Sequence, residues 1–250
     1  MRPPKILTFD IETAPNLGYT WGAYEQNVIK VVRPWYVLTV AWKWSDEKQA
    51  RVKTLADYKT FKKDIYNDKE LIEEVWGLLD RADIVVTQNG DQFDIKKLNT
   101  RFLLHGLPPP APYKSVDTKK ASKKHFAFVT NKLDNLGDEL GYGGKMHHEG
   151  FELWEKCMHG DPRAFKKMGA YNKRDVILTE KVYLRERPWM TAHPNINAWT
   201  GLENCRVCQS HDIHFRGFDV TATGRIRKWQ CQDCGAWTRD TKAERVTTKK

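Results

Sequence analysis

Acidic residues interrupt a hydrophobic stretch near the start of the chain. Lys5–Thr13 has the apolar character of a buried strand, yet Asp10 and Glu12 stand two positions apart within it. Alternate residues of a strand share a face, so both acids are expected to point the same way at the strand's C-terminal end. Solvated acids at an exposed strand end are the alternative. In a buried strand they need a partner or a cation, because burying an unpaired carboxylate is unfavourable.

Two further acids lie where helices are expected. Asp175 shares the spacing i, i+4, i+7, i+11 with Tyr171, Leu178 and Val182, which places it on the core-facing stripe of a helix. Asp94 lies at the start of another helical pattern. Two alternatives remain open, namely that Asp94 caps its helix and that Asp175 pairs with a Lys or Arg in the core.

Converging carboxylates favour one kind of chemistry. Three or four such groups repel one another, and hard divalent cations with a preference for oxygen relieve that repulsion. Two ions about 3.5–4 Å apart form a site for phosphoryl transfer. The chain carries 42 Lys and Arg against 32 Asp and Glu, with a net charge of +10, which favours a polyanionic partner. Together these features indicate a nuclease.

The elements that position these acids alternate between strands and helices. Strands are predicted at 5–12, 37–44, 51–55 and 83–89, and helices at 69–81, 94–105, 131–140 and from Asp161-Pro162 to about 185. Gly169 is expected to break or kink the last helix. The alternation predicts an α/β layer fold for residues 1–190.

Three motifs carry a family resemblance. F-D-I-E-T, N-G-D-Q-F-D-I-K-K-L and Y-N-K-R-D resemble, in this order, the exonuclease motifs of the DnaQ-like (DEDD) 3′–5′ exonucleases of the ribonuclease H-like superfamily. The resemblance spans about residues 5–185 and implies a ribonuclease H-like mixed sheet flanked by helices. Tyr171 lies four residues before Asp175, and Ala170 stands where the histidine subgroup has its histidine. The chain is therefore similar to the tyrosine (DEDDy) subgroup.

The resemblance also implies roles and a reaction. Asp10, Glu12 and Asp175 would hold two Mg²⁺ or Mn²⁺ ions, with Asp94 on the second ion. Tyr171, whose type has an unperturbed pKa near 10, would orient the attacking water. The substrate would be single-stranded DNA or RNA with a free 3′ end. Hydrolysis from that end would release 5′-mononucleotides. An endonucleolytic or structure-selective ribonuclease and a non-catalytic nucleic-acid-binding protein are the alternatives.

Four cysteines near the C-terminus form two C-x-x-C pairs. Cys205 and Cys208 are followed after 22 residues by Cys231 and Cys234, close to the spacing at which two knuckles close on one structural Zn²⁺. A redox pair or an iron site is the alternative. The segment resembles a zinc ribbon, a small β domain. The fifth cysteine, Cys157, lies outside these pairs and is expected to be a structural thiol.

Basic residues supply the candidate nucleic-acid contacts. These candidates are Lys119, Lys120, Lys123, Lys124, Lys145, Arg225, Arg227 and Lys228. An ordinary solvated face is the alternative for the lysines, and Phe215 and Trp229 between the knuckles are as compatible with a small ribbon core as with base stacking. The sequence does not support a metal role for His147 or His148.

The predicted organisation is an exonuclease domain at 1–190, a linker at 191–201, a zinc ribbon at 202–240 and a basic tail at 241–250. With no signal-peptide or membrane-spanning pattern, we expect a cytoplasmic protein that does not bind membranes. The chain most resembles standalone phage and bacterial proteins, so we expect it to work in a bacterial or phage-infected cell. It has no room for a polymerase, so we expect no proofreading in cis. Protein partners are not identified by the sequence.

Overall fold

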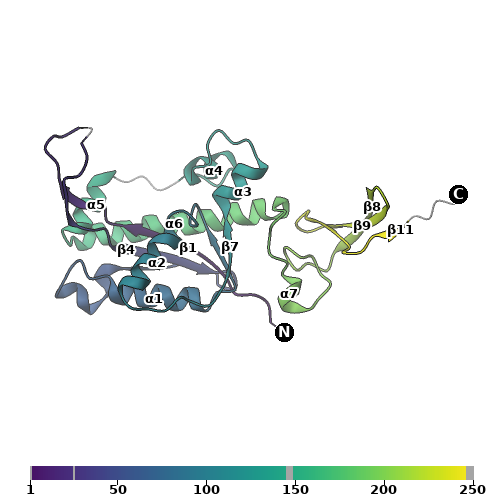
Figure 1. Ribbon diagram of the computed structural model, residues 1–250, viewed down its shortest axis with the longest axis horizontal. Coiled ribbons are helices and arrows are strands. Elements are labelled where there is room, and N and C mark those ends of the chain that lie inside the picture. Colours follow the sequence, from purple (N-terminus) through teal and green to yellow (C-terminus); the bar gives the residue numbers. More distant parts are fainter. Residues whose placement is uncertain (1, 25, 145–148, 246–250) are drawn as a thin grey trace. The chain divides into compact units, whose positions relative to one another are not determined.

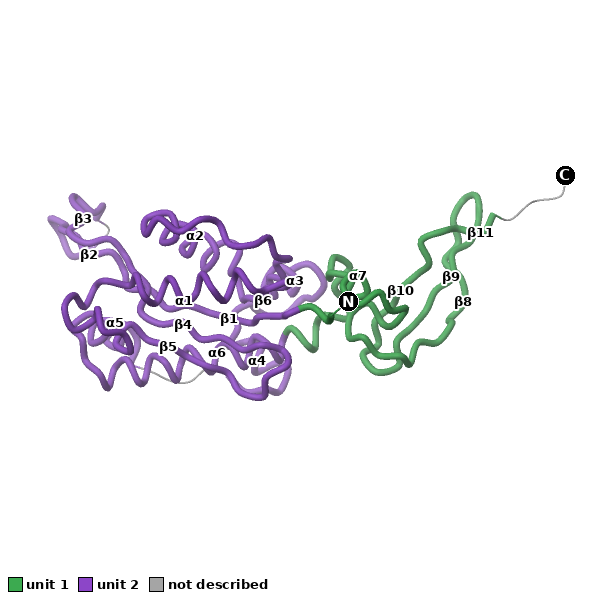
Figure 2. The backbone as a smooth tube through the Cα atoms, turned by 90° about the horizontal axis from the view of Figure 1, so that it is seen from below, with its two compact units in different colours: residues 1–4, 183–250 green, residues 5–182 purple. Residues whose placement is uncertain are grey.

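The computed structural model describes residues 2–24, 26–144 and 149–245. The chain divides into a larger unit, residues 5–182, and a smaller unit, residues 183–250 with residues 1–4 (Figure 2). The division falls within a helix, and the predicted domain boundary at 190 stays a prediction. In the described part of the chain, no helix combines the length and apolar character needed to cross a membrane.

A mixed sheet lies at the centre of the larger unit (Figure 1). Its five strands follow the order β5-β4-β1-β6-β7. β1 (Ile6–Thr13) pairs antiparallel with β4 (Val37–Trp44) and parallel with β6 (Ile84–Thr87). β5 (Arg51–Thr54) extends the antiparallel side, and β7 (Lys114–Asp117) extends the parallel side. Helices flank this sheet, so the predicted α/β class is confirmed.

The helices of the larger unit follow the predicted pattern in part. They are α1 (Lys69–Asp80), α2 (Asp94–Leu104), α3 (Thr118–His125), α4 (Leu133–Glu139), α5 (Phe151–Met158) and α6 (Pro162–Glu186), with short 3-10 turns η1 (Leu55–Asp57) and η2 (Lys59–Lys62). The helices at α1, α2, α4 and α6 are confirmed to within two residues at each end. The sequence did not predict α3, α5, β7 or the hairpin of β2 (Leu17–Tyr19) and β3 (Lys30–Arg33).

α6 runs without interruption through Gly169, so the predicted break at this residue is wrong. A Cβ at Gly169 would lie 3.3 Å from Thr54 Cγ2 and 3.4 Å from Val52 Cγ2 of β5. The glycine therefore allows close packing of α6 against β5. Leu133 and Leu136 of α4 pack in turn against Leu178 and Val182 of α6.

The smaller unit is built around four short strands. They are β8 (Ile213–Thr221), β9 (Gly224–Cys231), β10 (Trp237–Arg239) and β11 (Glu244–Arg245), and each of the others pairs antiparallel with β9. They follow a 3-10 turn η3 (Arg187–Trp189) and a short helix α7 (Asn197–Thr200). Among the described residues, a small buried cluster of this unit consists of Cys205, Val207, Cys231 and Ala236, with Cys208, Ile213 and Cys234 packed against it. Such a core is too small to fold a domain without a further link.

Candidate functional site

β1 holds the first two acids on a rigid support. Leu7, Phe9 and Ile11 are buried, whereas Asp10 and Glu12 are partly exposed on the alternate positions. β1 is hydrogen-bonded to a strand on each side, antiparallel to β4 and parallel to β6. The pairing with β6 covers Ile6–Thr8, whereas the pairing with β4 continues through Asp10 and Glu12, so β4 holds the backbone that carries the two acids.

α6 brings the third acid to the same place. Asp175 is only 2% exposed and lies one helical turn after Tyr171, which is also buried. One carboxylate oxygen from each of Asp10, Glu12 and Asp175 lies within 4.8 Å of the other two. A cation with oxygen ligands at about 2.0–2.6 Å can span that separation. An all-oxygen, all-carboxylate donor set fits a hard divalent cation.

A neighbour on α6 orients one of these acids. Asn172 is fully buried, and its Nδ2 donates a hydrogen bond to Asp10 Oδ2 at 2.6 Å. Its Oδ1 accepts a hydrogen bond from the Thr39 hydroxyl of β4 at 3.0 Å. Asn172 therefore fixes the plane of the Asp10 carboxylate. The sequence did not identify Asn172, because it lies outside the helical stripe that contains Tyr171 and Asp175.

Asp94 occupies the first residue of α2 without capping it. The N-cap position belongs to Phe93, and Asp94 Oδ1 instead accepts a hydrogen bond from the backbone N–H of Ile11 at 3.1 Å. This hydrogen bond connects the N-G-D-Q-F-D-I-K-K-L motif, which contains Asp94, to the F-D-I-E-T motif, which contains Ile11. Among the described residues, Asp94 is not part of the three-carboxylate cluster, so its predicted role at a second ion stays a prediction.

Burial shapes the electrostatics of Asp94. The side chain is 2% exposed, and its removal from water raises the pKa of Asp94 to about 7. The nearby charge of Asp117 also raises this pKa, whereas the N–H groups of Ile11 and Asp94 and the Lys97 ammonium lower it. A carboxyl group that is this unfavourable to ionise is typical of functional sites.

A pocket of about 390 Å³ opens beside the acids. It is lined by Asp10, Gln88, Asn89, Lys119, Asn131, Lys132, Leu133, Asp134 and Asp175. Asn89 adopts a left-handed backbone (φ 67°) in the turn after β6, a conformation that asparagine tolerates better than most residues. Lys119 and Lys132 bring positive charge to a pocket that also holds Asp10 and Asp175.

The other predicted lysine contacts have different surroundings. Lys120 pairs with Asp91 at 2.6 Å, and Lys123 and Lys124 are exposed on α3. Lys145 lies outside the described residues, as do His147 and His148. Of the predicted lysines that the structure describes, Lys119 is the one in the pocket. Lys132 was missed, because it follows no motif and reaches the pocket only through the position of α4.

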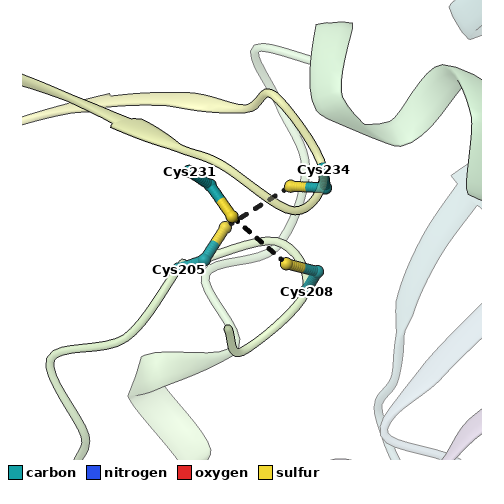
Figure 3. A group of neighbouring side chains, drawn as sticks. All are labelled: Cys205, Cys208, Cys231 and Cys234. Atoms are coloured by element: carbon teal, nitrogen blue, oxygen red, sulfur yellow. Dashed lines mark hydrogen bonds between the residues drawn. The ribbon is translucent and has the colours of Figure 1, made fainter. Parts of the chain in front are cut away.

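The four cysteines of the smaller unit converge (Figure 3). The Sγ atoms of Cys205 and Cys234 are 3.6 Å apart, as are those of Cys208 and Cys231. Four thiolates at about 2.3 Å from one Zn²⁺ would be about 3.8 Å from each other, so the residues fit a tetrahedral zinc site. Four protein ligands leave no open position for a reacting water.

Each of the two knuckles forms the same kind of backbone turn. Gln209 N–H donates to the Cys205 carbonyl at 2.9 Å, and Gly235 N–H donates to the Cys231 carbonyl at 3.0 Å. Both donors have a left-handed backbone, with φ of 66° at Gln209 and 78° at Gly235. Cys157 lies elsewhere, 1% exposed in α5, where burial raises the pKa of its thiol to about 12.

The remaining predicted contacts lie on β9. Arg225 pairs with Glu244 at 3.1 Å, and Arg227 pairs with Asp240 at 3.2 Å and Glu244 at 3.3 Å. Lys228 lines a separate pocket of the smaller unit. The Phe215 and Trp229 rings pack edge to face, with centroids 5.5 Å apart. Phe215 is 47% exposed, and neither ring belongs to the buried cluster of this unit.

Two comparisons with known proteins match more than half of the chain. A sequence model described as the RNase_H superfamily matches residues 33–185. No curated protein matches the chain. Among solved structures, a family B DNA polymerase from the hyperthermophilic archaeon Pyrobaculum calidifontis is similar, with a TM-score of 0.51 and 16% identity. The match covers 89% of this chain and 32% of the polymerase chain, and at this identity it shows the fold alone.

Proposed function

The chain belongs to the RNase_H superfamily, and from this premise we propose that it is a metal-dependent 3′–5′ exonuclease of the DnaQ-like, tyrosine-type group. It would hydrolyse single-stranded DNA or RNA and release 5′-mononucleotides. The superfamily and the ribonuclease H-like sheet support a nuclease in general. The observation that supports the finer proposal is the convergence of Asp10, Glu12 and Asp175. Two of these acids, Asp10 and Asp175, line one pocket, and Tyr171 lies one turn before Asp175.

The acids would hold the metals of this site. Asp10, Glu12 and Asp175 offer oxygen ligands at one point, and Asp94 offers a fourth carboxylate on the neighbouring helix. Two bound Mg²⁺ or Mn²⁺ ions supply charge stabilisation at the phosphate and lower the pKa of an attacking water. The identity and number of the ions belong to the proposal.

The chain's own residues position the reactants. Lys119 and Lys132, which line the pocket, bind phosphate oxygens next to the scissile bond. Tyr171 donates or accepts a hydrogen bond that orients the attacking water. The water oxygen forms the new bond to phosphorus, the P–O3′ bond breaks, and the shortened strand keeps the 3′-oxygen as a hydroxyl after it takes up a proton. The terminal unit leaves as a nucleoside 5′-monophosphate.

We also propose that Cys205, Cys208, Cys231 and Cys234 hold one structural Zn²⁺ in a zinc ribbon. The 3.6 Å spacing of the sulfur atoms supports this assignment. The ion would stabilise a unit whose buried cluster contains four small or medium residues. The ribbon would then help to bind the substrate strand.

Metal-dependent cleavage tests the proposed function. We expect the purified chain to cleave end-labelled single strands of DNA or RNA when Mg²⁺ or Mn²⁺ is added, and not without an added divalent ion. Duplexes of the same sequences show whether pairing protects the strand. If Mn²⁺ produced no cleavage of any of the four substrates, the chain would be a non-catalytic nucleic-acid-binding protein.

Asn172→Ala is expected to weaken metal binding. Without the hydrogen bond from Asn172 Nδ2, the Asp10 carboxylate loses its fixed orientation. Loss of such an outer contact typically reduces metal affinity about 10- to 100-fold, so the Mn²⁺ concentration at half-maximal cleavage should rise by that factor. Lys173→Ala, at the next position on α6, serves as the control and should leave it unchanged. An unchanged half-saturation in Asn172→Ala would remove the positioning role.

A further inference from the structure

A second pocket, of about 400 Å³, lies within the smaller unit. It is lined by Thr191, Arg206, Lys228, Trp237, Thr238 and Arg239; we call it the ribbon pocket. Its volume falls in the range of about 300–1,000 Å³ that is usual for small-molecule sites. The exonuclease mechanism uses none of its residues.

The two cysteine knuckles position the walls of the ribbon pocket. Arg206 lies inside the first C-x-x-C pair, and its carbonyl accepts a hydrogen bond from Ile196 N–H at 2.9 Å. Lys228 precedes Cys231 by three residues and Trp237 follows Cys234 by three. The strand register places Lys228 opposite Arg239, which shares a face of β10 with Trp237. The metal site therefore sets the spacing of the pocket's functional groups.

Two of the three cations that line the ribbon pocket, Arg206 and Lys228, have no acidic partner among the described residues. Arg239 pairs with Asp219 at 2.8 Å, but none of the ion pairs formed by the described residues includes Arg206 or Lys228. The Nε of Arg206 is buried and has no hydrogen-bond partner in the described structure. Cations that face one pocket repel each other, and an anionic ligand would relieve that repulsion. Phosphate suits arginine and lysine donors well.

An aromatic ring completes the ribbon pocket. Trp237 is 47% exposed, and the Lys228 Nζ lies 5.9 Å from its ring centroid. An exposed indole beside unpaired cations is the combination by which proteins hold single strands, with bases stacked on rings and phosphates on cations. An acidic peptide would use the cations but would leave the ring without a stacking partner.

We propose that the ribbon pocket binds one nucleotide unit of a single-stranded nucleic acid, with the base against Trp237 and the phosphate between Arg206 and Lys228. That the ligand is a strand and not a free nucleotide rests on the proposed nuclease function. The charge and the aromatic surface of the pocket do not depend on that function. Arg225 and Arg227, on alternate positions of the same strand, are paired with acids and carry no part of this binding.

The test measures binding apart from hydrolysis. Full-length chain carrying Asp175→Asn is titrated into a 5′-labelled single-stranded 20-mer without added Mg²⁺ or Mn²⁺, and fluorescence anisotropy is followed at increasing KCl. On this background, Arg206→Ala and Lys228→Ala should each flatten the slope of log K against log salt by about 0.7. Trp237→Ala should weaken binding by about 10- to 100-fold, and Trp237→Phe should retain most of it.

Arg225→Ala and Arg227→Ala are the matched controls on the same strand. They should change affinity less than twofold, and zinc content and circular dichroism should be unchanged in every variant that is compared. Equal affinities for the parent chain, Arg206→Ala and Trp237→Ala would overturn the proposal. Competition by inorganic phosphate or by a poly-glutamate peptide as strong as that by a dinucleotide would also overturn it.

The outcome for the ribbon pocket is separable from the outcome for the active site. If Arg206→Ala and Trp237→Ala lose strand binding while the unmodified chain cleaves nothing, the ribbon pocket stands and the nuclease proposal falls. If the unmodified chain cleaves strands and these variants bind them normally, the nuclease proposal stands and the ribbon pocket falls.

Discussion

Asp175→Asn is expected to lower the rate of strand hydrolysis by a factor on the order of 10³ or more. The substitution removes the only charge that α6 contributes to the carboxylate cluster, and a catalytic metal supplies several kcal/mol of charge stabilisation. The side chain keeps its shape, so the packing around this 2% exposed residue should survive. Because the buried position no longer holds a carboxylate, the metal-free variant should melt at the same temperature as the parent or higher.

The rate is measured under single-turnover conditions with Mn²⁺, and the melting temperature by circular dichroism. Glu180→Gln is the matched control, because Glu180 lies on the same helix and pairs with Lys43 at 2.5 Å. It should keep full activity and lose a little stability. An Asp175→Asn rate within tenfold of the parent would remove Asp175 from the metal site.

Loss of zinc is expected to unfold the smaller unit. Apparent binding free energies for structural zinc are about 10–16 kcal/mol, and the buried cluster of Cys205, Val207, Cys231 and Ala236 offers little stability of its own. Cys231→Ser, or treatment with a strong chelator, should therefore abolish protection of β8 and β9 from amide hydrogen exchange. The larger unit has its own core around β1 and β4 and should keep its protection.

Elemental analysis measures the number of zinc ions bound per chain. The parent chain should carry about one Zn²⁺, and Cys231→Ser should lose it. Cys157→Ser is the control, because that thiol is buried in the core of the larger unit and is not part of the cluster. Less than half a zinc ion per parent chain, purified without chelator, would contradict the zinc assignment, as would full protection of β8 and β9 in Cys231→Ser.

Local patterns predicted the strands and helices that carry the acids. β4 is a hydrophobic run rich in β-branched and aromatic residues, and the apolar stripe of α6 placed Asp175 and Tyr171 on a buried face. β7 and α3 were missed because their sequences, K-S-V-D and T-K-K-A-S-K-K-H, are mostly polar and have no apolar period. Their positions depend on pairing with β6 and on Asp117, whose side chain accepts from Lys120 N–H.

The site depends on contacts that spacing does not reveal. Asn172 and Lys132 reach the acids through the folding of α6 and α4, and no periodicity marks either residue. From the sequence Asp94 is a candidate helix cap, but in the structure it accepts a hydrogen bond from the strand N–H of Ile11. On the ribbon, the pairing of β9 with β11 brings Glu244 to Arg225, so composition alone selected arginines that are already paired.

The most direct test of the proposed exonuclease compares a linear strand with a circle. A 5′-labelled single-stranded DNA and RNA of one sequence, each also ligated into a closed circle, is incubated with the full-length chain and Mn²⁺. The proposed mechanism predicts a ladder that shortens from the 3′ end of the linear strand, with 5′-mononucleotides as product and both circles intact. Internal cutting of a circle, or release of the 5′ label as the first product, would contradict it.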